Sequence, residues 1–275
     1  MRIEDMIIVS DLDGTLVPES RIISQKNIDA ILRFRELGGD FTVATGRSPR
    51  ASRPVFETIQ LETPVITNNG AVIYDPKEAK PLWAKYLAPS FRDLIREAKE
   101  NYPEVGIEVI TATDEYCHIA NNYRMRDNVT VRDIIDTSNL PLMEERDLPD
   151  NSCKVLFTVE PENFEAFTDY LASRRYTDFE FVRSAADCLE MMAAGINKGY
   201  PFGELLKFYG KERAASIAVG DYYNDRELLE AAGIAVAPAN AIGEIKERAD
   251  LVVAACEADG IADLIDYLIS HYEHR

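Results

Sequence analysis

The amino-acid sequence predicts an α/β protein with a doubly wound, Rossmann-like parallel sheet and an inserted α+β domain. Residues 6–9 form a short apolar segment without polar alternation, which is typical of a strand buried on both faces of a parallel sheet. Segments of this kind alternate with helical stretches near both ends of the chain. The middle of the chain lacks this alternation, which indicates a second domain.

The N-terminal elements follow the order βαβαβ. After the first strand, Ser24 is expected to cap a helix whose apolar residues recur at helical spacing, and Gly38-Gly39 would end it. The elements that follow are a strand over 41–44, a helix from Pro49 and a strand at 65–66.

The C-terminal part repeats this alternation. In chain order, we expect a helix over 198–209, a strand over 216–219, a helix over 225–232, strands over 234–237 and 251–253, and a closing helix over 261–269. In the middle, helices over 91–100 and 162–174 are expected among strands over 107–110, 116–119, 155–159 and 179–182. We therefore assign residues 1–82 and 193–275 to a core and residues 83–192 to an inserted domain.

Composition limits the classes of partner and compartment. The formal net charge of −18 disfavours nucleic acid and anionic membrane surfaces, because either needs a basic face. The four cysteines form no C-x-x-C pair, which is typical of a reduced chain, and no apolar run reaches the roughly 18 residues that span a bilayer. The N-terminus does not match a signal or transit peptide. We expect a cytoplasmic protein without nucleic-acid or membrane partners.

Small polar residues follow four of the predicted strands. Because the carboxyl ends of strands in an open parallel sheet meet in one crevice, these side chains should lie close together. They are Asp11 and Asp13 after the first strand, Thr45 and Gly46 after the second, Asn69 and Gly70 after the third, and Asp221, Asn224 and Asp225 after a later one, with Lys198 at the start of a preceding helix.

Several carboxylates beside one lysine predict a site for a hard cation. Oxygen ligands of this kind suit Mg²⁺, which keeps several waters and a substrate phosphate in its coordination shell. The cation would offset the charge of Asp11 and Asp221, while Lys198, Thr45 and the amide of Gly46 would hold phosphoryl oxygens. An acidic chain can thus present a locally cationic pocket to a small phosphorylated metabolite.

Each segment also has a purely structural interpretation. The run D-x-D-G-T could be a strand followed by a turn, although it arises by chance in only on the order of a few per thousand chains of this length. Residues 45–47 alone could be a strand-to-helix turn, residues 220–225 a helix N-cap, and Lys198 a solvated residue. The functional interpretation therefore depends on their combination.

Four segments resemble, in order, the motifs of the haloacid dehalogenase superfamily. They are DLDGT at 11–15, ATGR at 44–47, NKG at 197–199 and GDYYND at 220–225. The NNGA run at 68–71 is similar to the Cof-type branch, whose members are mostly phosphatases of sugar phosphates and related metabolites. Only the interval between the second and third motifs is long enough for a large cap, which resembles the C2 caps of that branch.

The resemblance implies a magnesium-dependent phosphomonoester hydrolase that forms an aspartyl-phosphate. It implies that Asp11 is the nucleophile and Asp13 the general acid and base. It assigns substrate binding to Thr45, Gly46, Arg47, Lys198 and Asn224, magnesium binding to Asp11, Asp221 and the backbone carbonyl of Asp13, and support of Lys198 or of a ligand to Asp225.

Two other functions would use the same residues. A phosphosugar mutase of the phosphomannomutase type would return the phosphoryl group to the sugar, and a phosphometabolite-binding protein would bind without turnover. A binding protein needs neither a nucleophile nor an acid, so Asp11 and Asp13 disfavour that hypothesis. Arg124 and Arg126 are candidates for contacts with the leaving group, or else solvated surface residues.

Overall fold

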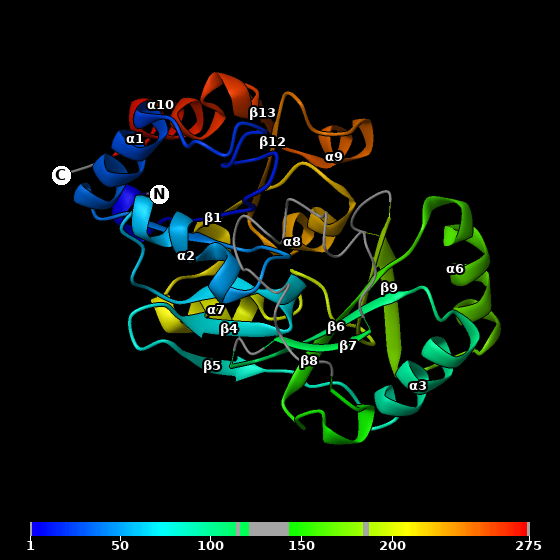
Figure 1. Cartoon of the computed structure of the whole chain (residues 1–275). Helices are drawn as coiled ribbons and strands as arrows, with labels where there is room; N and C mark the ends of the chain where they lie inside the picture. The colour runs from blue at the N-terminus through cyan, green and yellow to red at the C-terminus, as the bar shows by residue number, and fades with distance from the viewer. Residues whose placement is uncertain (1, 114–115, 121–142, 184–186, 274–275) are drawn as a thin grey trace. The chain divides into compact units, whose positions relative to one another are not determined.

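A computed structural model describes residues 2–113, 116–120, 143–183 and 187–273 (Figure 1). The chain divides into two compact units. The core unit comprises Met1–Arg47, Ser52–Leu82 and Asn197–Arg275, and the inserted unit comprises Ser48–Ala51 and Trp83–Ile196. Within the described residues, every helix is too short or too polar to cross a membrane.

The core unit contains a five-stranded parallel sheet in the order β13-β12-β11-β1-β2. Strand β1 (Ile7–Ser10) lies between β11 and β2, and all four of its residues are buried, as the apolar run predicts. The other strands are β2 (Asp40–Val43), β11 (Ser216–Val219), β12 (Ile234–Pro238) and β13 (Leu251–Val253). Ser10 is in register with both Val43 and Val219, so these three strands end at the same edge of the sheet.

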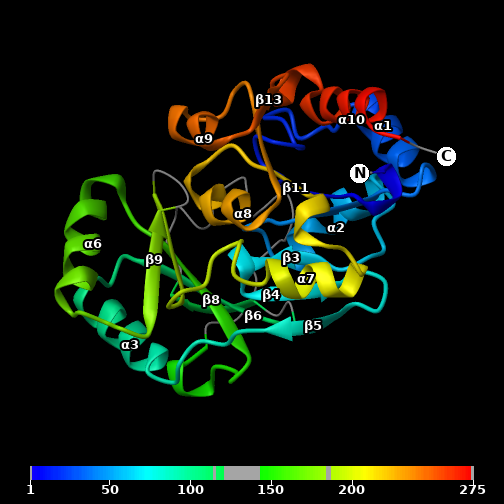
Figure 2. The same cartoon turned by 180° about the vertical axis from the view of Figure 1, so that it is seen from behind.

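Helices cover this sheet on both faces. They are α1 (Gln25–Glu36), α2 (Pro49–Thr58), α7 (Phe202–Tyr209), α8 (Arg226–Ala231), α9 (Gly243–Arg248) and α10 (Gly260–His271). Figures 1 and 2 show α1 and α10 side by side on one face, with α7 and α8 on the other. Ser24 caps α1 as predicted, because its hydroxyl accepts a hydrogen bond from the Asn27 amide at 3.0 Å.

The third strand of the predicted parallel sheet belongs to a different sheet. Strand β3 (Val65–Thr67) pairs antiparallel with β4 (Val72–Asp75), and β5 (Lys80–Ala84) completes a three-stranded sheet in the order β3-β4-β5. A single parallel bridge between Ala44 and Ile66 connects β3 to the end of β2. The carboxyl end of β3 nevertheless lies beside that of β2.

The helix predicted over 198–209 begins four residues later, at Phe202. Pro201 explains the difference, because proline disfavours helical backbone in the residue that precedes it. Asn197 forms a turn instead: its side-chain oxygen accepts from the amides of Gly199 at 3.1 Å and Tyr200 at 2.9 Å. Lys198 therefore lies in a turn and not in a helix.

The inserted unit is an antiparallel sheet in the order β7-β6-β8-β10-β9 with two helices packed on it. Its strands are β6 (Gly106–Thr111), β7 (Tyr116–Ala120), β8 (Ser152–Thr158), β9 (Phe179–Arg183) and β10 (Cys188–Ala193), and its helices are α3 (Phe91–Asn101) and α6 (Phe164–Ser173). The sequence does not predict β10. The parallel core sheet and the separate antiparallel sheet confirm the predicted fold class.

The two faces of the inserted sheet differ in chemistry. Val155 and Met191 pack in the apolar cluster to which α3 and α6 also contribute. Glu108, Lys154 and Glu190 alternate with the apolar residues and lie on the opposite face, where each is less than a tenth exposed. Lys154 Nζ lies 3.2 Å from Glu190 Oε1.

Candidate active site

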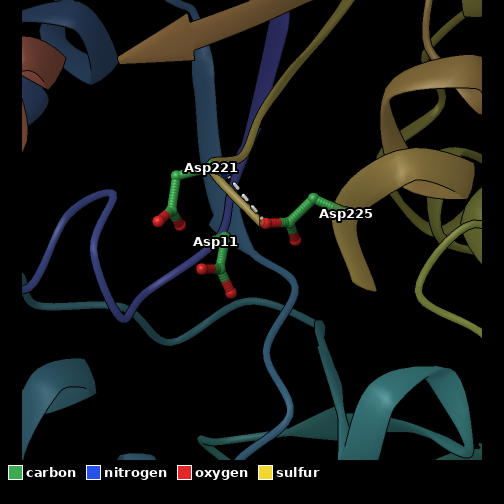
Figure 3. Close-up of side chains that lie close together, drawn as sticks. All are labelled: Asp11, Asp221 and Asp225. Carbon is green, nitrogen blue, oxygen red and sulfur yellow. Dashed lines mark hydrogen bonds between the residues drawn. The ribbon is translucent and has the colours of Figure 1, made fainter. Parts of the chain in front are cut away.

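Three carboxylates converge at the carboxyl edge of the core sheet. Asp11 directly follows β1, Asp221 follows β11, and Asp225 lies at the end of the 3₁₀ turn Tyr223–Asp225. One oxygen of each carboxylate lies within 4.8 Å of an oxygen of the other two. Figure 3 shows the three side chains close together. The Asp11 amide donates to the Val219 carbonyl at 2.8 Å, which extends the pairing of β1 and β11 to the site itself.

Lys198 neutralises part of this charge. Its Nζ lies 2.6 Å from Asp11 Oδ1 and 2.6 Å from Asp225 Oδ1, and all three residues are nearly inaccessible to solvent. Burial and the repulsion of Asp225 hold the pKa of Asp11 well above its ordinary value. Burial lowers the pKa of Lys198, but the attraction of Asp11 and Asp225 outweighs it and raises that pKa above the ordinary value.

Asp225 has both oxygens engaged by the protein. Oδ1 contacts Lys198, and Oδ2 accepts from the amides of Asp221 at 3.0 Å and Tyr222 at 3.1 Å. A side chain on Gly220 would collide with Asp225, so the close approach of this carboxylate requires glycine there. Asp225 thus orients Lys198 and the loop that carries Asp221.

Asp221 is held in place by the loop that follows β1. Its Oδ1 accepts from the Thr15 hydroxyl at 3.0 Å. Gly14 has a φ of 81°, and a Cβ there would lie 2.5 Å from Asp221 Oδ2, so the loop after β1 packs directly on this carboxylate. Burial and the repulsion of Asp225 raise the pKa of Asp221 to about 6.

The carboxylate of Asp13 lies apart from this cluster. It pairs with the Arg47 guanidinium through two contacts, one of them from Nε to Oδ2 at 2.8 Å and the other from Nη2 to Oδ1. The Asp13 side chain is 62% exposed, whereas that of Arg47 is 17% exposed. The structure therefore places the Arg47 guanidinium in contact with Asp13, the residue expected to act as general acid and base.

Thr45 and Gly46 form a tight turn beyond β2. The Thr45 hydroxyl accepts from the Arg47 amide at 3.1 Å, and the Thr45 amide donates to the Ile66 carbonyl at 3.0 Å. Asn224 lies on the other side of this turn, where its Nδ2 donates to Asn69 Oδ1 at 3.2 Å. The turn, Asn69 and Asn224 therefore form one connected group.

Two residues at the site had no role in the sequence-based assignment. Thr15 holds Asp221, and Asn69 holds Asn224. The position of Asn69 at the end of a strand indicated that it lies near the site. The sequence did not reveal its contact with Asn224, which lies 155 positions later. Arg124 and Arg126 lie outside the described residues.

The chain is similar to known hydrolases along nearly its whole length. A family model for haloacid dehalogenase-like hydrolases matches residues 8–265. A 5-amino-6-(5-phospho-D-ribitylamino)uracil phosphatase of Bacillus subtilis is 28% identical over 273 residues, which cover 95% of this chain and 97% of the relative. A pyridoxal phosphate phosphatase of Escherichia coli is 28% identical over 277 residues, with 94% and 97% coverage.

The fold is also found in solved structures. A haloacid dehalogenase-like hydrolase from Bacteroides thetaiotaomicron matches with a TM-score of 0.85 at 23% identity, over 96% of this chain and 99% of that chain. A hydrolase of the same description from B. subtilis matches with a TM-score of 0.78 at 26% identity, over 96% and 99%. These matches confirm the resemblance seen in the sequence motifs. The chain belongs to the haloacid dehalogenase-like hydrolases, within their phosphatase branch.

Proposed function

We propose that this protein is a magnesium-dependent phosphomonoester hydrolase that acts on a small phosphorylated metabolite, with sugar phosphates as the substrate class. The observation that carries the proposal is the buried Asp11 carboxylate, which Lys198 holds by one oxygen. The second oxygen has no hydrogen-bond partner among the described residues. A nucleophile must be fixed in direction and keep one reactive oxygen, and Asp11 meets both conditions.

The reaction we propose has two steps. First, Asp11 Oδ2 forms a bond to phosphorus as the bond to the leaving oxygen breaks, and Asp13 donates its proton to that oxygen. Second, water attacks the aspartyl-phosphate, its proton passes to Asp13, and the bond between Asp11 and phosphorus breaks. Arg47 Nε lies 2.8 Å from Asp13 Oδ2, so Arg47 would orient the Asp13 side chain for both proton transfers.

The donor set of the site fits Mg²⁺. Three carboxylates face one ammonium group, so the cluster carries two negative charges in excess, and this excess helps raise the pKa values of Asp11 and Asp221. Asp11 and Asp221 would supply carboxylate oxygens, and the Asp13 carbonyl would be the third protein ligand. When bound, the cation would offset this charge and allow a phosphate dianion to approach.

The remaining residues would position the phosphoryl group. We assign this task to Thr45, Gly46, Lys198 and Asn224, which lie around the cluster on three separate segments. Arg47 would contribute mainly through Asp13. The similar enzymes named above act on phosphomonoesters of small metabolites, which supports the same substrate class here, without a nucleic-acid or membrane partner.

A phosphatase screen tests this proposal. Purified protein should release inorganic phosphate from at least one of glucose 6-phosphate, ribose 5-phosphate, pyridoxal 5′-phosphate and p-nitrophenyl phosphate, and EDTA should abolish the release. Asp11→Asn keeps the shape of the side chain and should lose at least a thousandfold in kcat. Formation of an isomeric sugar phosphate without free phosphate would indicate a mutase instead. Equal rates for wild type and Asp11→Asn would contradict the nucleophile assignment.

A further inference from the structure

The turn that follows β3 has an uncommon backbone. Asn68, Asn69 and Gly70 have φ values of 51°, 52° and 95°, so three consecutive residues lie in the left-handed region. This conformation costs roughly 1 kcal/mol or more for a residue other than glycine, although asparagine tolerates it better than most. Such strain persists where the surrounding structure holds the backbone in place and is common at functional sites.

The backbone of this turn contacts two segments of the site. The Asn68 amide donates to the Arg47 carbonyl at 2.9 Å, and the Asn69 amide donates to the Thr45 carbonyl at 3.0 Å. Gly70 packs so closely on the Asn197 carbonyl that any side chain would collide with it. The turn therefore lies between the Thr45–Arg47 segment and the residue before Lys198.

The Asn69 side chain completes these contacts. It is 4% exposed, and its Oδ1 accepts from Asn224 Nδ2 at 3.2 Å. A Cβ on Gly46 would lie 2.9 Å from the same oxygen, so the side chain lies against the Gly46 backbone. This hydrogen bond holds the side-chain amide of Asn224 in one orientation.

We infer that Asn69 is a positioning residue for phosphate binding, because it fixes the orientation of the Asn224 amide beside Gly46. The inference rests on the proposed function, in which Asn224 and Gly46 contact the phosphoryl group. The competing explanation is that asparagine stands here only to tolerate the left-handed backbone. The two explanations differ in whether the side chain is needed.

Asn69→Gly separates them. Glycine adopts a φ of 52° without strain, so this variant keeps the backbone and removes only the side chain. Gln60→Gly is the matched control, because Gln60 has the same φ of 52° but is exposed in the loop after α2. Gln60→Gly should retain or raise the thermal midpoint. Asn69→Gly should remain folded, because relief of the left-handed strain offsets part of the loss of its buried hydrogen bond. With Mg²⁺ and p-nitrophenyl phosphate, Asn69→Gly should lower kcat/KM about tenfold, the effect of one hydrogen bond at the reacting group, and Gln60→Gly should not change it.

A double-mutant cycle tests whether Asn69 acts through Asn224. In an Asn224→Ala background, Asn69→Gly should change kcat/KM by less than about twofold. The inference is overturned if Asn69→Gly alone retains wild-type activity, or if its effect is equally large in the Asn224→Ala background.

Phosphate binding provides a readout that is independent of turnover. Titration calorimetry with inorganic phosphate and Mg²⁺ should show about tenfold weaker binding to Asn69→Gly than to wild type or Gln60→Gly. If the wild type released no phosphate from any ester, the proposed function would fail, and this measurement alone would decide the inference. Equal phosphate affinity in wild type and Asn69→Gly would then overturn it.

Discussion

Glu108 is expected to make the stability of the inserted unit depend on pH near neutrality. Its carboxyl group lies on the face of the inserted sheet that also carries Lys154 and Glu190. Burial raises its pKa from 4.5 to about 7, while the attraction of Lys154 opposes part of the rise. The folded-state pKa exceeds the unfolded-state pKa, so folding favours the protonated form. The stabilisation from this group is complete below about pH 4.5 and is lost as the pH rises through about 7.

The magnitude follows from the shift. A difference of about 2.5 pKa units corresponds to about 3.4 kcal/mol in full, and about 2 kcal/mol of it is lost between pH 5.5 and 8.5. Glu108→Gln keeps the size of the side chain and removes its titration. The free energy of unfolding of the wild type, relative to this variant, should therefore fall by about 2 kcal/mol over that range. Any pH-independent cost of the substitution cancels in the comparison.

Urea unfolding at pH 5.5 and 8.5 measures this difference, read from the transition in which the inserted unit unfolds. Glu100→Gln is a suitable control, because Glu100 is an exposed carboxylate on α3 of the same unit. The control should show the same pH dependence as the wild type. If the difference between wild type and Glu108→Gln stays constant within about 0.5 kcal/mol, the proposed titration of Glu108 is wrong.

Three further predictions concern the core unit. Burial raises the pKa of Asp221 to about 6, so protons compete with Mg²⁺ for this carboxylate at low pH. The half-saturating Mg²⁺ concentration should therefore rise about tenfold from pH 7 to pH 5. An unchanged concentration would contradict the competition. Lys198→Met leaves two buried carboxylates without their cation, so kcat should fall at least a hundredfold and the thermal midpoint of the metal-free protein should drop. A kcat within tenfold of wild type would refute the proposed role of Lys198 in positioning the phosphoryl group. Gly14→Ala places a Cβ 2.5 Å from Asp221 Oδ2 and should raise the half-saturating Mg²⁺ concentration about tenfold. Gly195→Ala is the control, because Gly195 has a φ of 76° and open space around it, and this variant should change only thermal stability. Equal Mg²⁺ requirements in both variants would exclude the clash as the cause.

The predictable part of the fold is the part that local chemistry determines. The apolar run of β1 and the Ser24 cap of α1 are properties of short segments, and both have the expected structure. The start of α7 differs because Pro201 outweighs the helical pattern of its neighbours. The pairing of β3 depends on hydrogen bonds to β4, and a three-residue strand carries too little pattern to reveal its partner.

The site shows the same division. The proximity of Asp11 and Asp221 follows from strand order alone, because parallel strands end at one edge. The contacts of individual side chains do not follow from strand order. Asp13 pairs with Arg47, and Asp225 engages Lys198 together with two backbone amides, and each depends on a rotamer that only the packed structure selects.

The position of β1 between β2 and β11 has a consequence for synthesis of the chain. One edge of β1 pairs with β2, which follows soon after it, but the other edge pairs with β11, which starts at Ser216. The strands of the inserted unit all lie within residues 106–193 and are made before β11. A nascent chain therefore carries an unsatisfied β1 edge until most of the chain has been translated. The inserted unit has all its strands before Asp11 and Asp221 can meet.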